Sequence, residues 1–179
     1  DVFVARLSST ATPTWALRAG GSGDDRASAI ELLDDGSWVI AGSFSTTMRV
    51  GTNTLTSAGS TDAFYASGTQ AGAFSSSQGF GGTLADAATS VDSSTTQIFV
   101  GGSFQDAANL GDAIRVSAGS SDVFVVAIAR STSVVEWSAT GGGTGADVLY
   151  GVVSGPDGYP VLAGSFSSTA TFGSTALTS

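Results

Sequence analysis

The hydrophobic residues of this chain occur in short runs, rich in β-branched and aromatic residues, between segments rich in Gly, Ser and Asp. Such runs predict β-strands joined by turns, and no run of useful length has the period of a helix. In Val123–Ala129 the hydrophobic residues are consecutive, so both faces of this predicted strand should be buried. A strand of an ordinary two-layer sandwich would alternate hydrophobic and polar residues instead.

One seven-residue phrase occurs three times, as "WVIAGSF" at Trp38–Phe44, "IFVGGSF" at Ile98–Phe104 and "PVLAGSF" at Pro160–Phe166. A Gly-Gly pair recurs with it at a spacing of 61 residues, at Gly20-Gly21, Gly81-Gly82 and Gly142-Gly143. Self-similarity at a fixed period of this length predicts repeats of several strands each. We therefore treat residues 1–179 as a single β-repeat domain with units of about 1–61, 62–121 and 122–179.

Four main strands are predicted in each unit. In the first full set they run near Ala27–Leu33, over Trp38–Phe44 after an Asp-Gly turn, from Asp62, and up to the next Gly-Gly pair. A small hairpin is expected between the second and third strands. The repeated Gly-Ser-Phe suggests a tight strand exit, where Gly allows close approach of another backbone and Phe fills the space between neighbouring sheets.

The order D-x-F-V, Trp, G-G-x-x-x-D, apolar strand, D-G, V-x-x-G-S-F and F-G resembles the bacterial β-propeller repeat of secreted and cell-surface proteins. The middle unit departs from it, with Ser76 at the Trp position and Ser94-Thr95 in place of Asp-Gly. The resemblance implies an all-β fold of four-stranded antiparallel blades around an axis. A β-trefoil also has three repeats, but its units are usually shorter.

The strands with which the chain begins and ends lead to an expectation about its partners. The chain begins with the third and fourth strands of one blade and ends after the second strand and hairpin of another. Inside the chain the four residues Ala58–Thr61 join these same points. Propellers have ~4–8 blades, so we expect a partial propeller. Flanking repeats of the same chain would complete it, or other chains would. In the second case two copies of this chain would give six blades.

The amino-acid composition excludes or disfavours several kinds of catalytic site, metal site and partner. The chain has no Cys and no His, which excludes thiolate metal sites and Ser-His-Asp or Cys-His catalysis. Its net charge of −9 disfavours nucleic acid as a partner. No apolar run is long enough for membrane insertion. Glu31 and Glu136 do not recur between units, so a glycosidase carboxylate pair has little support.

Asp25, Asp86 and Asp147 form the most regular set of ionisable residues, each four residues after the second Gly of a pair. The structural interpretation is a turn whose carboxylate accepts hydrogen bonds from nearby backbone N–H groups. The functional interpretation is calcium coordination, which needs several converging oxygens. The sequence favours the structural interpretation and keeps calcium as the alternative; it assigns no metal site.

Three tryptophans, Trp15, Trp38 and Trp137, are candidates for stacking on sugar rings, although covering sheet edges is the more ordinary role. With no catalytic set, we expect a non-enzymatic structural or interaction module of an extracellular or cell-surface protein. The alternative is a carbohydrate-binding, lectin-like propeller. Other protein chains or flanking repeats are the expected partners, with glycans as the partner in the alternative.

Overall fold

The computed structural model describes residues 1–179 and consists of antiparallel strands and turns, so the all-β prediction is confirmed. No helix in it is long and apolar enough to cross a membrane. The strands are β1 (Val2–Leu7), β2 (Pro13–Gly21), β3 (Asp25–Leu32), β4 (Trp38–Phe44), β5 (Thr47–Val50), β6 (Asn53–Thr56), β7 (Asp62–Thr69), β8 (Ala73–Gly82), β9 (Ala87–Ser93), β10 (Gln97–Phe104), β11 (Ala107–Asn109), β12 (Ile114–Val116), β13 (Asp122–Ala129), β14 (Val135–Gly143), β15 (Val148–Ser154), β16 (Pro160–Ser165), β17 (Thr169–Phe172) and β18 (Thr175–Thr178).

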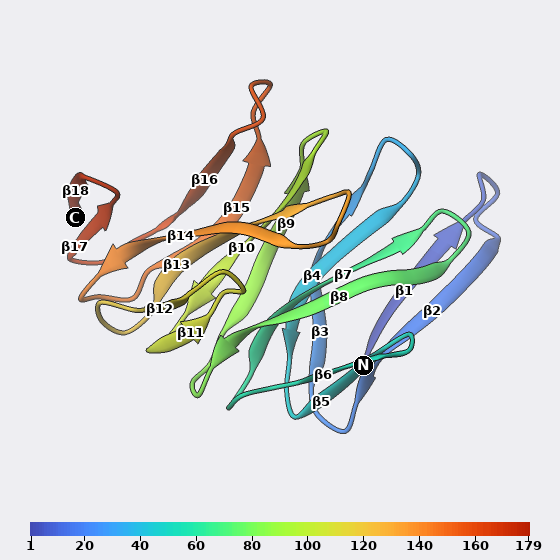
Figure 1. Ribbon diagram of the computed structural model, residues 1–179, viewed down its shortest axis with the longest axis horizontal. Helices are drawn as coiled ribbons and strands as arrows, with labels where there is room; N and C mark the ends of the chain where they lie inside the picture. Colours follow the sequence, from blue (N-terminus) through green and yellow to red (C-terminus); the bar gives the residue numbers. More distant parts are fainter.

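Four sheets lie side by side in chain order, from β1 and β2 on the right of Figure 1 to β15 and β16 on the left. The N-terminal sheet has the order β1-β2-β5-β6, and the C-terminal sheet consists of β15 and β16. The second sheet, β3-β4-β7-β8-β11-β12, and the third, β9-β10-β13-β14-β17-β18, share one order. None of these orders closes on itself, whereas a β-trefoil requires a closed barrel.

The repeated phrase forms the second strand from the sheet end, as predicted. β4 covers Trp38–Phe44, β10 includes Ile98–Phe104, and β16 covers Pro160–Ser165. The predicted third and fourth strands are β7, which begins at Asp62, and β8, which ends at Gly82. The sequence therefore predicted these strands close to their observed bounds.

The predicted number of four strands in a sheet is wrong for the second and third sheets, which have six. The small hairpin of each unit pairs with the preceding sheet: β5 with β2, β11 with β8, and β17 with β14. The second glycine of each pair makes this possible. A Cβ on Gly82 would lie 1.9 Å from the carbonyl oxygen of Ala107 on β11, so only Gly permits the hairpin backbone to approach.

The glycine of each Gly-Ser-Phe lies opposite a β-bulge. In the third sheet Gly101 pairs with Ser90 and Gly102 with Ala88, so Thr89 has no partner across the strand. A Cβ on Gly102 would lie 2.0 Å from the carbonyl oxygen of Ala87. The bulge brings the first strand close to the second, and this closeness explains the recurring Gly.

Hydrophobic side chains fill the spaces between neighbouring sheets. The largest cluster has 16 buried residues, from the second and third sheets, and includes Val39, Val91 and Phe104. A cluster of 11 lies between the N-terminal and second sheets, and a cluster of 4 joins the third to the C-terminal sheet. β13 is buried along its whole length, which confirms the prediction for Val123–Ala129. Burial is thus greatest where a sheet has a neighbour on both sides.

A matched pair of substitutions tests this packing. Ile128 is fully buried on β13, whereas Ile114 on β12 is 71% exposed. We expect Ile128→Ala to lower the free energy of unfolding by about 2–5 kcal/mol through lost burial and a residual cavity. Ile114→Ala should change it by no more than about 0.5 kcal/mol. Urea denaturation of both variants measures the difference, and equal effects would contradict the assigned core.

Candidate functional site

The recurring Asp86 and Asp147 tie two strand ends together through backbone hydrogen bonds. Asp86 Oδ2 accepts from the Gly82 N–H at 2.7 Å, and its Oδ1 accepts from the Gln105 N–H at 2.9 Å. Asp147 accepts in the same way from the N–H groups of Gly143 and Ser167, at 2.8 and 3.2 Å. Each carboxylate therefore links the end of a fourth strand to the residue after a Gly-Ser-Phe.

Asp25 makes only half of this arrangement. Its Oδ2 accepts from the Gly21 N–H at 2.8 Å, but its buried Oδ1 has no hydrogen-bond partner. The N–H of Ser45, which corresponds to Gln105, donates to the carbonyl oxygen of Asp24 instead. The first turn is therefore the one in which a carboxylate oxygen is left free.

A second carboxylate lies beside each of these three, and sequence reasoning missed the pairing. A Cβ on Gly81 would lie 2.7 Å from both Asp62 Cγ and Asp86 Oδ2, so the two side chains flank this glycine. The same geometry joins Asp1 to Asp25 across Gly20, and Asp122 to Asp147 across Gly142. The signal was present in the recurring Asp of the D-x-F segment.

Burial raises the pKa values of three of these carboxyls, those of Asp62, Asp86 and Asp122. Burial raises the pKa of Asp86 to about 6, the charge of Asp62 adds to the rise, and the hydrogen bonds from Gln105 and Gly82 oppose it. Burial likewise raises the pKa of Asp62. Burial and then the charge of Asp147 raise the pKa of Asp122. These three carboxyls therefore bind protons more readily than an exposed aspartate does.

Two carboxylate oxygens are candidates for holding a cation. Asp25 Oδ1 and Asp122 Oδ1 are buried and accept no hydrogen bond. No group of three or more acidic, His or Cys side chains converges on one point. Ca²⁺ takes about six to eight oxygen ligands, so backbone carbonyls and water would have to supply most of them. Calcium at Asp25, Asp86 or Asp147 stays a prediction.

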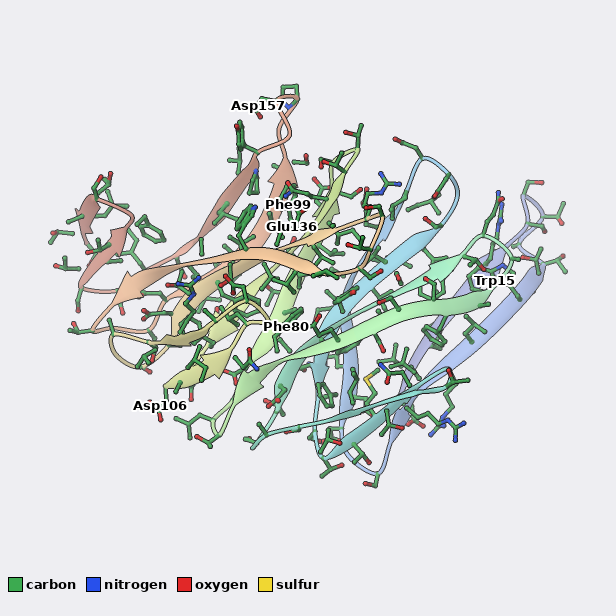
Figure 2. The ribbon with its side chains drawn as sticks, in the orientation of Figure 1. Trp15, Phe80, Phe99, Asp106, Glu136 and Asp157 are labelled. Atoms are coloured by element: carbon green, nitrogen blue, oxygen red, sulfur yellow. The ribbon has the colours of Figure 1, made fainter.

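The tryptophans pack between strands and lie in two separate places. Trp38 is buried, its indole N–H donates to the Thr69 carbonyl oxygen at 3.0 Å, and its ring centroid is 6.0 Å from that of Trp15. Trp137 packs against Phe99 at 6.0 Å. Figure 2 shows Trp15 far to the right of Phe99. The three rings therefore form no common platform for a sugar.

A further acidic contact lies between the first strands of neighbouring sheets. Glu31 on β3 faces Asp92 on β9; burial, and then the charge of Asp92, raise the pKa of Glu31. Asp92 also accepts a hydrogen bond from the Ser154 N–H on β15. Glu31 lines a polar cleft of about 710 Å³ between the turns at the strand ends, with Asp157 at the tip of the turn between β15 and β16 (Figure 2). Because Glu31 does not recur between units, no repeated pattern in the sequence predicts this contact.

Comparison with protein-family models and with curated protein sequences found no match.

The raised pKa of Asp86 predicts a pH dependence of stability. Because the folded state binds this proton more tightly than the unfolded chain, its contribution is present at low pH and is lost as pH rises through about 6. A rise of about two pKa units corresponds to roughly 3 kcal/mol at most. Asp86→Asn should remove this part of the slope of unfolding free energy between pH 4.5 and 7.5, measured by urea denaturation. The exposed Asp157→Asn is the matched control, and an unchanged slope in Asp86→Asn would contradict the assignment.

Calcium binding has a direct test. Because Asp86 and Asp147 already accept backbone hydrogen bonds through both oxygens, we expect the melting temperature to be the same in EGTA and in excess calcium. A ligand that binds only the folded state raises the melting temperature. A calcium-dependent rise that Asp25→Asn abolishes would show instead that the free oxygen of the first turn holds the ion.

Proposed function

We propose that this chain is a non-catalytic structural and interaction module of an extracellular or cell-surface protein, whose sheets are successive blades of a propeller-like array. The shared strand order of the second and third sheets supports this arrangement, as does the row of sheets in Figure 1. The module acts by joining further β-sheet units through the open sides of its two terminal sheets.

The unequal burial of corresponding side chains carries the proposal. Phe64 on β7 is 0% exposed and Phe124 on β13 is 1% exposed. Phe3 on β1, which occupies the corresponding place, is 79% exposed. Exposed apolar side chains gathered on one surface are typical of sites that bind another protein. The side of β1 that lacks a partner strand is therefore suited to protein contact.

Two observations support a structural role in preference to catalysis or carbohydrate binding. The recurring carboxylates accept backbone hydrogen bonds, as a turn-stabilising role requires. The tryptophans are engaged in packing between strands, so no observation favours the carbohydrate-binding alternative. The acidic charge and the many Ser and Thr residues suit a protein surface outside the cell.

A tandem protein tests the joining function. Two full copies are fused so that Ser179 leads through Ala-Gly-Ser-Thr, the segment found at Ala58–Thr61, into Asp1 of the second copy. Val161→Asp is then placed either in the first copy, at the junction, or in the second copy, at the free end. We expect the junction variant to lower the free energy of unfolding by about 2 kcal/mol, because it buries a charge.

The free-end variant is the matched control, because Val161 there is 61% exposed and a charge remains in water. Its free energy of unfolding should change by no more than about 0.5 kcal/mol. Equal effects at the two positions in calorimetry and urea denaturation would mean that the terminal sheets do not join, and the proposed function would fall.

A further inference from the structure

We propose that β16 of one copy of this chain pairs with β1 of a second copy, with Gly164 opposite Phe3. The contact creates a six-stranded sheet of order β15-β16-β1-β2-β5-β6. The inference rests on the proposed function and names the partner of the open sides: a second copy of the chain.

The two terminal sheets are complementary parts of one pattern. In the second and third sheets the strand that carries Gly-Ser-Phe, β4 or β10, is paired on both sides. Its partners are the first strand of the sheet and the strand that begins at Asp62 or Asp122. β16 has only the first of these partners, β15, and β1 has only the strand after it, β2. Each terminal sheet therefore lacks the strand that the other offers.

The interior sheets also supply the register. In both of them the Gly of Gly-Ser-Phe lies opposite the Phe of the following strand: Gly42 with Phe64, and Gly102 with Phe124. Transferred to the contact, this register places Gly164 opposite Phe3 and Leu162 opposite Ala5. The residues at the position of Leu162, Ile40 and Val100, are fully buried, whereas Leu162 is exposed.

An apolar groove beside β1 has the shape that a second strand requires. In the second sheet, β4 pairs with β7 and packs against β9 of the third sheet. β4 therefore fills the space between β7 and β9. The corresponding space between β1 and β3 is open and lined mainly by apolar residues, among them Phe3, Ala5, Ala29 and Ile30. Ile30 is 62% exposed, whereas its counterparts Val91 and Val152 are 7% and 3% exposed. β16 of a second copy would cover Ile30 as β4 covers Val91.

The strand edges themselves differ in how they are protected. The outermost strands β6, β12 and β18 have only 4, 3 and 4 residues, and short edge strands discourage pairing. β1 and β16 have 6 residues each; β16 contains no charged residue and β1 contains one, Arg6. These two strands lie at opposite ends of the row in Figure 1, so one copy cannot pair its own β16 with its own β1.

Cross-linking of single-cysteine variants tests the pairing and its register. The chain has no cysteine, so each introduced thiol is unique. Ala5→Cys and Leu162→Cys are mixed and oxidised. We expect a disulfide-linked dimer because opposed residues have Cβ atoms about 4.5–5.5 Å apart, and a small shift brings them to the roughly 3.5–4.5 Å that a disulfide spans. The matched control mixes Ala5→Cys with Val161→Cys, whose side chain points to the other face of the strand. Equal yields from the two mixtures, or no linked dimer from either, would overturn the register.

Sedimentation velocity tests the association itself. We expect the wild-type chain to form dimers or longer oligomers as its concentration rises, and Val161→Asp or Phe3→Asp to remain monomeric. Val134→Asp, at a site 60% exposed in the turn between β13 and β14, is the matched control and should associate like wild type. An equimolar mixture of Phe3→Asp and Val161→Asp keeps one intact contact, so it should form a heterodimer and nothing larger. Circular dichroism checks that each variant is folded.

The outcomes separate this inference from the proposed function. A wild-type chain that stays monomeric at every concentration overturns pairing with a second copy. If the tandem protein still loses stability only from the junction substitution, the joining function stands and its partner is a flanking segment instead. If the tandem shows no difference either, both fall. Oligomers that Phe3→Asp and Val161→Asp leave intact would place the contact on another surface and overturn the inference.

Discussion

The close approach of a hairpin to the end of the preceding sheet is the interaction on which the rest of the fold depends. It requires a glycine, because any Cβ at Gly21, Gly82 or Gly143 would meet a hairpin carbonyl oxygen at less than 2 Å. The N–H of that same glycine donates to the buried carboxylate four residues later. One residue thus lets the next unit's hairpin join the sheet and holds the turn that leads to the next sheet.

This connection makes the molecule a series of sheets, each tied to its neighbours by backbone and by packed side chains. A side chain is then buried according to how many neighbours its sheet has, more than according to its own hydrophobicity. Val91 and Ile30 show this clearly, since the larger hydrophobic residue is the more exposed of the two. In such an array stability depends on nearest-neighbour contacts, and the two ends are where apolar surface remains uncovered.

The sequence predicted the strands well because their signals are local. Trp38–Phe44 is a β-rich run between turn residues, and it forms β4 without a change of bounds. The destination of the hairpin could not be predicted, because Thr47–Val50 carries no mark of which sheet it joins. Which sheet the hairpin joins depends on the space left by a glycine in an earlier strand, distant in the sequence. The partner of Asp86 was missed for a similar reason: Asp62 becomes its neighbour only when two strands flank Gly81.

The buried carboxylates show that a regular ionisable pattern need not mark a site of chemistry. Asp147 is fully buried, yet both of its oxygens accept backbone N–H groups that a turn would otherwise leave unpaired. Buried polar groups without partners are costly, so an aspartate at this place is favoured although a second carboxylate lies close by. The raised pKa of Asp86 follows from this compromise between hydrogen bonding and burial. It requires no reaction.

The proposed contact between copies has a geometric consequence. A head-to-tail contact either closes into a ring or continues as a filament, depending on the rotation between successive units. A sheet shared by two copies has the same strand order and register as the interior sheets, so it would carry forward the rotation that the hairpin connections already impose. If the proposed contact closes into a propeller-like ring, the number of copies would be set by the rotation from one sheet to the next, and propellers close at ~4–8 sheets. In the proposed assembly the pairing of β16 with β1 would determine which strands meet, and the rotation set by the glycine-dependent hairpin connections would determine whether the ring closes.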